Sequence, residues 1–329
     1  MKFIDMHCDT LMKFISKSDT ESLLNNSISV DFTRMKKGGA LAQFFAMFLL
    51  PGEESWKRVG ISPMTDWEYI NRLSEQFYDD LAANSDLIAF AGNYDDMIAN
   101  EKAGKMSAFL TIEDGRFIEG DMANLVKSYE KGVRLITLTW NGINCNGYPH
   151  GIDPATQATN LTDFGKEVVH KMNEMGMVVD VSHLSDAGFW DVLDICKKNG
   201  KPFVASHSNL RSLSPHTRNL TDDMLKALGE AGGCTGINFA PDFLNPDTTD
   251  KNSTVAAMAK HALRMKDLGG IEVVALGSDL DGISGQLEVD SIDKMPMLFD
   301  EFKKVGFSES EIEKIAYTNA ARVIKDAMK

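Results

Sequence analysis

The chain has 329 residues, of which 43% are hydrophobic and 25% charged, so it is neither a disordered nor a fibrous protein. The net charge of −14 argues against a nucleic-acid partner, because binding to phosphate backbones depends on Lys and Arg. No apolar run is long enough for a transmembrane helix, the N-terminus lacks the apolar core of a signal peptide, and the four cysteines are widely spaced. We therefore expect a cytoplasmic protein without a membrane partner that acts on small molecules.

Short apolar runs alternate along the chain with segments of helical periodicity. The expected strands span residues 2–6, 41–49, 107–112, 133–139, 177–182, 202–206, 234–239 and 272–277. The expected helices span residues 66–83, 121–131, 162–175, 186–198, 221–231, 253–267, 291–304, 308–316 and 317–328. A weaker apolar run at 87–91 is placed outside the main sheet, and the stretches 51–65 and 141–160 are interpreted as long irregular loops.

The alternation of strand and helix, with strands apolar along their whole length, is typical of parallel strands covered by helices. Eight such units without a Pro- or Gly-rich linker favour one (β/α)8 TIM-type barrel over two doubly wound halves. We expect residues 1–329 to form a single α/β domain, with extra loop and helix insertions near the N-terminus and additional helices at the C-terminus. The two long loops would help to form a lid over the pocket.

Titratable side chains follow five of the expected strands, at the end where barrels of this type carry their chemistry. His7 and Asp9 are two residues apart and would share one face of a strand. The other side chains at this end are Glu113, His183, His207 and Asp279. Singly, each has an ordinary structural explanation, since Asp or Glu before Gly usually makes a turn. However, three of the seven histidines come at the ends of expected strands, and ordinary structural roles explain that coincidence poorly.

Imidazoles combined with Asp and Glu, and no thiolate, suit Zn²⁺ or a similar ion in a catalytic site. Two ligand clusters and a carboxylate able to bridge them suggest two metals, which can share a hydroxide and hold the attacked carbonyl oxygen. His7 and Asp9 would bind one ion, and Asp279 could take a proton from the water and return it to a leaving amine. Asp5 is interpreted as a buried hydrogen-bonded residue in preference to one that supports the metal.

The remaining four histidines are interpreted as structural residues. His170 and His261 lie in helical segments, His150 is in a loop, and His216 is in a polar stretch.

The blocks that contain these residues resemble those of a known family. They are DMHCDT (5–10), TIEDG (111–115), LITLTWN (135–141), DVSHLSD (180–186), ASHSNLRSL with HTRNLTDDML (205–225) and ALGSDLDG (275–282). As an ordered set they resemble the membrane dipeptidase (renal dipeptidase) family of zinc peptidases, among the amidohydrolase-like barrels. The resemblance extends from residue 5 to about residue 325.

The resemblance implies a binuclear zinc enzyme that hydrolyses dipeptides with a free C-terminal carboxylate (L-Xaa-L/D-Xaa) by a hydroxide bridging two zinc ions. It also implies a possible homodimer. By position it assigns His7 and Asp9 to one zinc, Glu113 as the bridging carboxylate, His183 and His207 to the second zinc, Arg218 to the substrate carboxylate, and Asp279 as the acid/base aspartate. A guanidinium can pair with a carboxylate through two hydrogen bonds, which would confine the enzyme to short peptides.

One position departs from the family pattern. Many members have a histidine where this chain has Trp140, and that histidine is associated with substrate contact and with stabilising the tetrahedral intermediate. Asn141 or Asn144 could supply a replacement amide donor to the oxyanion. Loss of one such donor typically costs about 10² to 10³ in rate, so the substitution affects efficiency and specificity more than reaction type.

Three alternatives follow from the same residues. An amidohydrolase could act on another small amide, such as an N-acyl amino acid or a β-lactam. A catalytically impaired binding protein could retain the barrel, with Trp140 as the reason for the impairment. A phosphoesterase is disfavoured because only isolated Arg211 and Arg218 are available for a phosphate.

Overall fold

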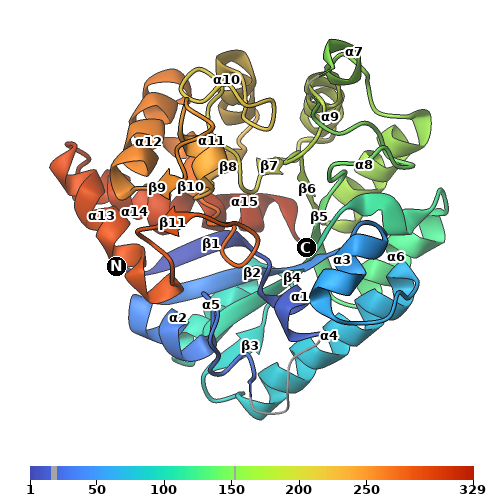
Figure 1. The fold of residues 1–329 in the computed structure, drawn as a ribbon, viewed down its shortest axis with the longest axis horizontal. Helices are drawn as coiled ribbons and strands as arrows, with labels where there is room; N and C mark the ends of the chain where they lie inside the picture. Colours follow the sequence, from blue (N-terminus) through green and yellow to red (C-terminus); the bar gives the residue numbers. More distant parts are fainter. Residues whose placement is uncertain (16–20, 152) are drawn as a thin grey trace.

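The computed structural model describes residues 1–15, 21–151 and 153–329. Within these residues, eight parallel strands close into a barrel that is covered on the outside by helices (Figure 1). The strands in order around the barrel are β1 (Phe3–Cys8), β2 (Ala40–Phe48), β4 (Met106–Glu113), β5 (Val133–Thr137), β6 (Val178–Asp180), β7 (Val204–Ala205), β8 (Cys234–Ile237) and β10 (Val274–Leu276). Pairing of Asp5 with Leu276 joins β10 back to β1. The predicted (β/α)8 TIM-type barrel is confirmed.

The expectation that the run 87–91 lies outside the main sheet is wrong. Strand β3 (Ile88–Phe90) pairs in parallel with the first residues of β4, from Met106 to Ala108. Because β2 occupies one edge of β4, β3 shares the other edge with β5, which pairs with β4 from Leu110 onward. Strand β3 therefore adds to the sheet beside the first residues of β4, before the pairing of β4 with β5 begins, and it is not a ninth member of the closed ring.

Helices follow most of the strands and pack around the barrel (Figure 1). They are α1 (Thr10–Phe14), α2 (Phe32–Gly38), α3 (Gly52–Val59), α4 (Asp66–Ala83), α5 (Tyr94–Lys102), α6 (Met122–Glu130), α7 (Pro154–Gln157), α8 (Asp163–Met175), α9 (Asp186–Asn199), α10 (Asp222–Glu230), α11 (Pro241–Leu244), α12 (Val255–Gly269), α13 (Met295–Lys304), α14 (Glu309–Glu313) and α15 (Asn319–Ala327). The side chains of Thr162, Thr221 and Ser308 accept hydrogen bonds from backbone N–H groups in the first turns of α8, α10 and α14, as their sequences predict. Strands β9 (Asn252–Ser253) and β11 (Gln286–Leu287) form a separate two-stranded sheet.

Two further expectations need correction. The stretch 51–65 is not irregular, because it contains α3, a charged helix in which Trp56 is buried and which ends at Gly60 in a left-handed conformation. Only Trp56 and Val59 are apolar among its eight residues, which is too short an apolar stripe to identify the helix from the sequence. The two expected C-terminal helices form one continuous segment, in which α14 passes through a π-helical turn at Lys314–Thr318 into α15. No Gly or Pro interrupts the sequence there.

The barrel interior is filled below the site. One apolar cluster takes a residue from each strand of the closed ring: Ile4, Phe44, Phe109, Leu135, Val178, Val204, Cys234 and Ala275. Residues of α15, including Ile324, join the same cluster, and Figure 1 shows this helix behind the strands. Because this end is packed, the polar residues at the other end of the strands form the floor of any cavity.

Candidate metal centre

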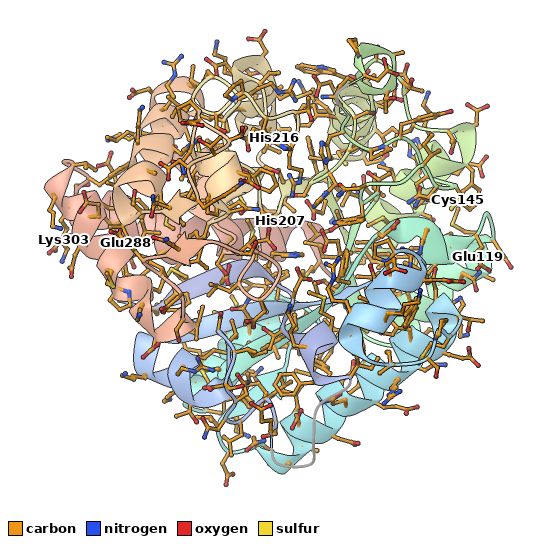
Figure 2. All side chains as sticks on the ribbon, in the orientation of Figure 1. Glu119, Cys145, His207, His216, Glu288 and Lys303 are labelled. Atoms are coloured by element: carbon orange, nitrogen blue, oxygen red, sulfur yellow. The ribbon has the colours of Figure 1, made fainter. Side chains whose placement is uncertain are left out.

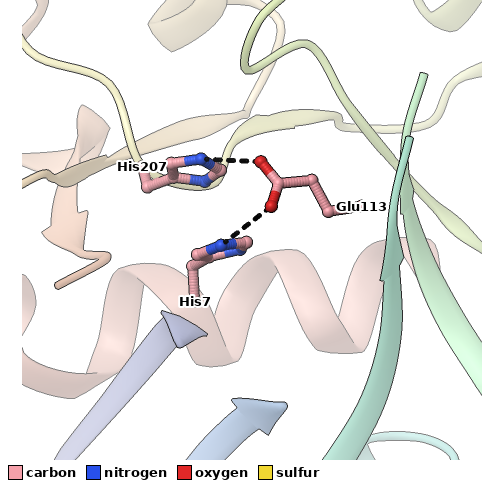
Figure 3. Close-up of side chains that lie close together, drawn as sticks. All are labelled: His7, Glu113 and His207. Atoms are coloured by element: carbon pink, nitrogen blue, oxygen red, sulfur yellow. Dashed lines mark ion pairs between the residues drawn. The ribbon is translucent and has the colours of Figure 1, made fainter. Parts of the chain in front are cut away.

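The six rim residues named from the sequence come together in one buried site. They are His7 on β1, Asp9 at the start of α1, Glu113 at the end of β4, and His183, His207 and Asp279 in the segments after β6, β7 and β10. Each of them is at most 8% exposed. His207 lies near the middle of the molecule in Figure 2, whereas Lys303 and Glu119 lie at its edge. Figure 3 shows the Glu113 carboxylate between His7 and His207, with one oxygen directed toward each ring.

His7 is surrounded by carboxylates. Its Nε2 lies 3.6 Å from Asp9 Oδ2, 3.6 Å from Glu113 Oε2 and 3.9 Å from Asp279 Oδ1. Strand β1 ends at Cys8, so Asp9 reaches His7 from the residue that caps α1 and not from the strand itself. The expected proximity of His7 and Asp9 is therefore observed, but the turn into α1 contributes to it.

His183 and His207 direct their Nε2 atoms at each other and at Glu113. The two Nε2 atoms are 3.3 Å apart, and Glu113 Oε1 lies 3.0 Å from the first and 3.5 Å from the second. His7 and His207 are also close, with stacked rings whose centroids are 3.8 Å apart. One carboxylate thus spans all three imidazoles.

Hydrogen bonds on the far sides of these rings determine which nitrogen carries the proton. Ser206 Oγ donates to Asp180 Oδ2 at 2.6 Å, so it must accept the 2.6 Å hydrogen bond that it shares with His207 Nδ1. Asn141 Oδ1 lies 3.1 Å from His183 Nδ1 and accepts its proton. In both neutral rings the Nε2 lone pair therefore faces the centre of the site, as in histidines that bind metals.

These contacts fit a metal ion better than a self-contained hydrogen-bond network. His7 Nδ1, His7 Nε2 and Asp9 Oδ1 are buried and make no hydrogen bond within the described residues. Buried polar atoms without partners are costly, and acceptors facing one another repel unless a cation lies between them. Two ligand groups can be distinguished, one formed by His7, Glu113 and His207 and the other by His7, Asp9 and Asp279.

The electrostatics of the cluster also favour a positive charge. Burial opposes protonation of His7, but the carboxylates of Glu113 and Asp9 outweigh it and raise the pKa of the imidazole to about 10. Burial, reinforced by Asp9, raises the pKa of Glu113 well above its usual range. Burial and nearby positive charge lower the pKa values of His183 and His207, which keeps both rings neutral. Three acidic groups around the two neutral imidazoles of His183 and His207, with His7 where positive charge is favoured, form a donor set that divalent cations prefer.

Two residues of the cluster have unusual backbone conformations. His183 has a φ of 68° and Asp279 a φ of 61°, a region that residues other than glycine rarely adopt. Backbone hydrogen bonds from His150 N to His183 O and from Asp279 N to His7 O hold these turns in place. The strain directs both side chains into the site, which is a common use of such conformations.

A cavity of about 520 Å³ opens onto the cluster. Asp9, Glu113, His183 and Asp279 form part of its floor. Its walls come partly from the stretch 51–65, through Pro51, Ser55, Arg58 and Val59, and partly from the segment Ala240–Phe243 after β8. Asn141, from the stretch 141–160, also lines the cavity, so both stretches predicted to cover the pocket border it.

The residues proposed to replace the missing family histidine are placed differently. Trp140 and Asn141 line the cavity, and the Trp140 ring packs edge-on against Phe48 with centroids 5.0 Å apart. Asn144 does not line it, because its Nδ2 donates to Asp114 Oδ1 and to Leu138 O at 2.9 Å each.

Arg218 is buried beside the cluster and does not line the cavity. Its Nη2 donates to His207 O at 3.0 Å, its Nη1 donates to Ser208 Oγ at 2.5 Å, and its Nε is buried without a hydrogen bond within the described residues. Burial lowers the pKa of Arg218 to about 10, and the nearby carboxylates Asp180 and Asp279 oppose this shift. The guanidinium remains charged near neutral pH, and its Nε–H has no partner within the described residues.

Sequence reasoning missed several supporting residues. His150 lies beside His183, with ring centroids 5.7 Å apart, and its Nε2 is 3.0 Å from Asn141 Oδ1 while its Nδ1 is 3.0 Å from Thr217 Oγ1. Asp180 and Ser206 orient His207 from the ends of β6 and β7. The sequence VVDVSH could have indicated the role of Asp180, since a carboxylate within an apolar run must be buried with hydrogen-bond partners.

Other sequence interpretations are confirmed. His261 is a core histidine that accepts a hydrogen bond from Leu210 N at 3.2 Å and contacts Leu244 O at 3.1 Å. Asp5 accepts hydrogen bonds from Ser278 N and Ser278 Oγ at 2.7 and 2.6 Å, so it is a buried hydrogen-bonded residue.

A closed (β/α)8 barrel with histidines and carboxylates gathered at one end is the arrangement of a metal-dependent hydrolase. The sequence profile described as "Membrane dipeptidase (Peptidase family M19)" matches residues 1–329, and the chain belongs to this family. The resemblance inferred from the motifs is thereby confirmed, and the chain is grouped with dipeptidase-type metallopeptidases.

Curated relatives and solved structures agree with this family. An uncharacterized dipeptidase of Schizosaccharomyces pombe is 30% identical over 90% of this chain and 71% of its own length. The dipeptidase aclJ of Aspergillus oryzae is 31% identical over 90% of this chain and 69% of its own. A metallopeptidase from Rhodobacter sphaeroides, solved with a phosphinate mimic of the dipeptide L-Ala-D-Ala, has a TM-score of 0.89 at 22% identity, with 99% of both chains covered, and shows the same fold.

No helix in the described part of the chain has the length and apolar character needed to cross a membrane. The cytoplasmic location and the homodimer expected from the sequence remain predictions.

Proposed function

We propose that this protein is a dipeptidase with two zinc ions that hydrolyses the amide bond of dipeptides carrying a free C-terminal carboxylate. His7 and Asp9 would hold one ion, His183 and His207 the other, and Glu113 would bridge them. When bound, the two ions would polarise the substrate carbonyl and activate a water molecule for attack. The observation that carries the proposal is the convergence of three imidazoles and three carboxylates in one cluster, in which some buried atoms have no partner within the described residues and four of the six side chains line one cavity.

The assignment of ligands to each of the two ions is also part of the proposal, because His7 lies close to both groups of ligands. His7 is close to both Asp9 and Glu113, and its ring stacks on His207. The division follows the family pattern, and the tautomers support it, since His183 and His207 both direct Nε2 toward Glu113 Oε1.

Asp279 would move the proton during the reaction. Burial raises the pKa of its carboxyl to about 7, with Asp9 adding to the rise and His7 opposing it. Its Oδ2 accepts a hydrogen bond from Asn238 Nδ2 at 2.9 Å, which orients the carboxylate. A carboxylate at the cavity floor can accept the proton of the attacking water and deliver it to the leaving amine.

Arg218 would provide positive charge for the substrate carboxylate. Its unpaired Nε–H and its place behind His207 allow it to attract an anion above the cluster, although two of its nitrogens are already held by Ser208 and His207. Asn141, which lines the cavity, would be the amide nearest to a developing oxyanion, because Asn144 is turned away.

A dipeptide panel tests the proposal directly. The purified chain is depleted of metal with a chelator, reloaded with Zn²⁺, and assayed on L-Ala-L-Ala, L-Ala-D-Ala and N-acetyl-L-Ala. Two results together support the proposal: the dipeptides are hydrolysed only when metal is restored, and the active protein contains two zinc ions per chain. Hydrolysis of N-acetyl-L-Ala alone would instead identify an amidohydrolase of N-acyl amino acids, and two bound ions without any turnover would identify an impaired binding protein.

A further inference from the structure

The cavity has a second charged region away from the metal cluster. It consists of Lys13 on α1 and Arg58 on α3, which both line the cavity and are both exposed. We propose that Lys13 and Arg58 form a second carboxylate subsite, which selects dipeptides whose N-terminal residue has an acidic side chain. The inference rests on the proposed dipeptidase function and adds a substrate class to it.

Among the residues that the structure describes, the two cations have no partner. Within the described residues neither Lys13 nor Arg58 makes an ion pair or a side-chain hydrogen bond, although Asp9 lies one helical turn before Lys13. Asp242, an acidic residue on the cavity wall away from the cluster, is already paired with Lys251 at 2.5 Å. In a chain of net charge −14, two unpaired cations facing one cavity are available to an anion from solution.

Helix α3 is oriented so that Arg58 faces the cavity. Ser55, Arg58 and Val59 occupy one face of the helix and line the cavity, while Trp56 packs against Tyr69 with ring centroids 5.2 Å apart. The neighbouring Lys57 does not line the cavity and pairs with Glu54 on the same helix at 2.7 Å. The packing of Trp56 thus orients the helix so that Arg58 lines the cavity, whereas Lys57 lies outside it and pairs with Glu54.

The barrel places this subsite opposite Arg218. Arg58 follows β2 and Arg218 follows β7, and these strands are four positions apart in either direction around the eight-stranded ring. A dipeptide whose carbonyl lies over the metal cluster, with its C-terminal carboxylate toward Arg218, would extend its N-terminal residue toward α1 and α3. The side chain of that residue would then be the group within reach of Lys13 and Arg58.

The alternative is that these residues only offset the acidic floor of the cavity. In that case they would attract every anionic substrate without distinguishing its N-terminal side chain. Comparing the effect of an acidic side chain on the N-terminal residue with its effect on the C-terminal residue separates the two roles, because general attraction would favour both acidic dipeptides alike.

The experiment compares Glu-Ala with Gln-Ala on the zinc-loaded protein. These dipeptides have the same length and the same C-terminal residue but differ by one net charge, so Ala-Glu and Ala-Gln, which differ by the same charge on the other residue, are compared in parallel. We expect kcat/KM to be about five- to tenfold higher for Glu-Ala at low salt, since partly exposed ion pairs are individually modest. The ratio should decline as NaCl is raised, because salt screens exposed charges.

The variants Lys13→Met and Arg58→Met should each lower the Glu-Ala to Gln-Ala ratio, and the double variant should bring it close to one. Lys57→Met, on the same helix but outside the cavity, is the matched control and should leave the ratio unchanged. Zinc content per chain and circular dichroism confirm that each variant is folded and loaded.

The outcomes distinguish this inference from the function on which it rests. Equal kcat/KM for Glu-Ala and Gln-Ala in the unmodified protein, an equally large preference for Ala-Glu over Ala-Gln, or a Glu-Ala to Gln-Ala ratio that persists in the double variant overturns the subsite while leaving the dipeptidase intact. Absence of hydrolysis of any dipeptide by the zinc-loaded protein overturns the proposed function itself.

Discussion

Ser206 donates a 2.6 Å hydrogen bond to Asp180, and this contact determines which nitrogen of His207 faces the proposed metal centre. Asp180 also accepts hydrogen bonds from Thr137 Oγ1 at 2.6 Å and from the backbone N–H groups of Ser182 and Ser206 at 2.9 and 2.8 Å. Its two oxygens are thus satisfied by donors from three consecutive strand ends. The hydroxyl of Ser206 retains only its lone pairs for His207 Nδ1, which leaves Nε2 free for a cation.

Replacement of this serine should weaken metal binding. In Ser206→Ala the His207 Nδ1–H loses its acceptor, so the ring is no longer held in the tautomer that binds metal. We expect the zinc affinity to fall about 10- to 100-fold, measured by competition with a chromogenic chelator. Ser128→Ala, at a buried serine that donates to Leu125 O far from the site, should retain full affinity. Equal affinity in both variants would contradict the orienting role.

Gly282 lies against two of the proposed metal-site carboxylates. A Cβ at this position would overlap Asp9 Oδ2 and would lie 2.5 Å from Asp279 Oδ1. In Gly282→Ala we expect both short side chains to be displaced, with a loss of turnover of about 10² or more and lower zinc content per chain. Elemental analysis and a dipeptide assay measure the two effects.

Gly142→Ala is the control for this prediction. Gly142 lies near the cavity, and a Cβ there would meet nothing within 4 Å. A Gly282→Ala protein that binds two zinc ions and turns over like Gly142→Ala would show that Asp9 and Asp279 are not required in their observed positions.

Removal of Arg218 should penalise a free substrate carboxylate. In Arg218→Met, kcat/KM for a dipeptide should fall about 10- to 100-fold, the range for a charge-assisted hydrogen bond, whereas its C-terminal amide should lose much less. Steady-state assays on L-Ala-L-Ala and its amide measure the difference. Equal losses on both substrates would assign Arg218 to holding His207 and Ser208 instead.

His261 should make the folded state sensitive to acid. Burial lowers the pKa of this imidazole to about 4, and the contact with Leu244 O opposes the shift. Its Nδ1 accepts from Leu210 N, so protonation would break that hydrogen bond. Between pH 6.5 and 4 the unfolded chain binds a proton that the folded chain does not, and the free energy of unfolding therefore decreases as pH falls through this range.

The size of this effect is about 3 kcal/mol, from a difference of about 2.5 pH units between the two states. Urea unfolding of the metal-free protein and of His261→Gln at pH 7.5 and pH 4.5 measures it. The variant should be less stable at pH 7.5, and its deficit should shrink toward pH 4.5. A deficit that is constant with pH would show that His261 titrates normally.

The amino-acid sequence by itself determined the barrel and the candidate ligands. Strands buried on both faces leave continuous apolar runs, and the chemistry of a parallel barrel lies at one end of them, so His7, Glu113 and His207 could be placed from their positions after such runs. The same local patterns predicted the caps at Thr162, Thr221 and Ser308.

Only the tertiary structure decided the contacts between segments distant in the sequence. Strand β3 is recognised through its pairing with β4, and α3 through the packing of Trp56, because both are too short to establish a periodicity of their own. The Asp180 and Ser206 pair, the burial of Arg218, and the meeting of Lys13 and Arg58 at one cavity depend on which strand ends are neighbours in the closed ring. Residue type and local spacing indicate what a side chain can do, but whether a charge is paired, buried or free is set by partners that the chain brings together only when the barrel closes.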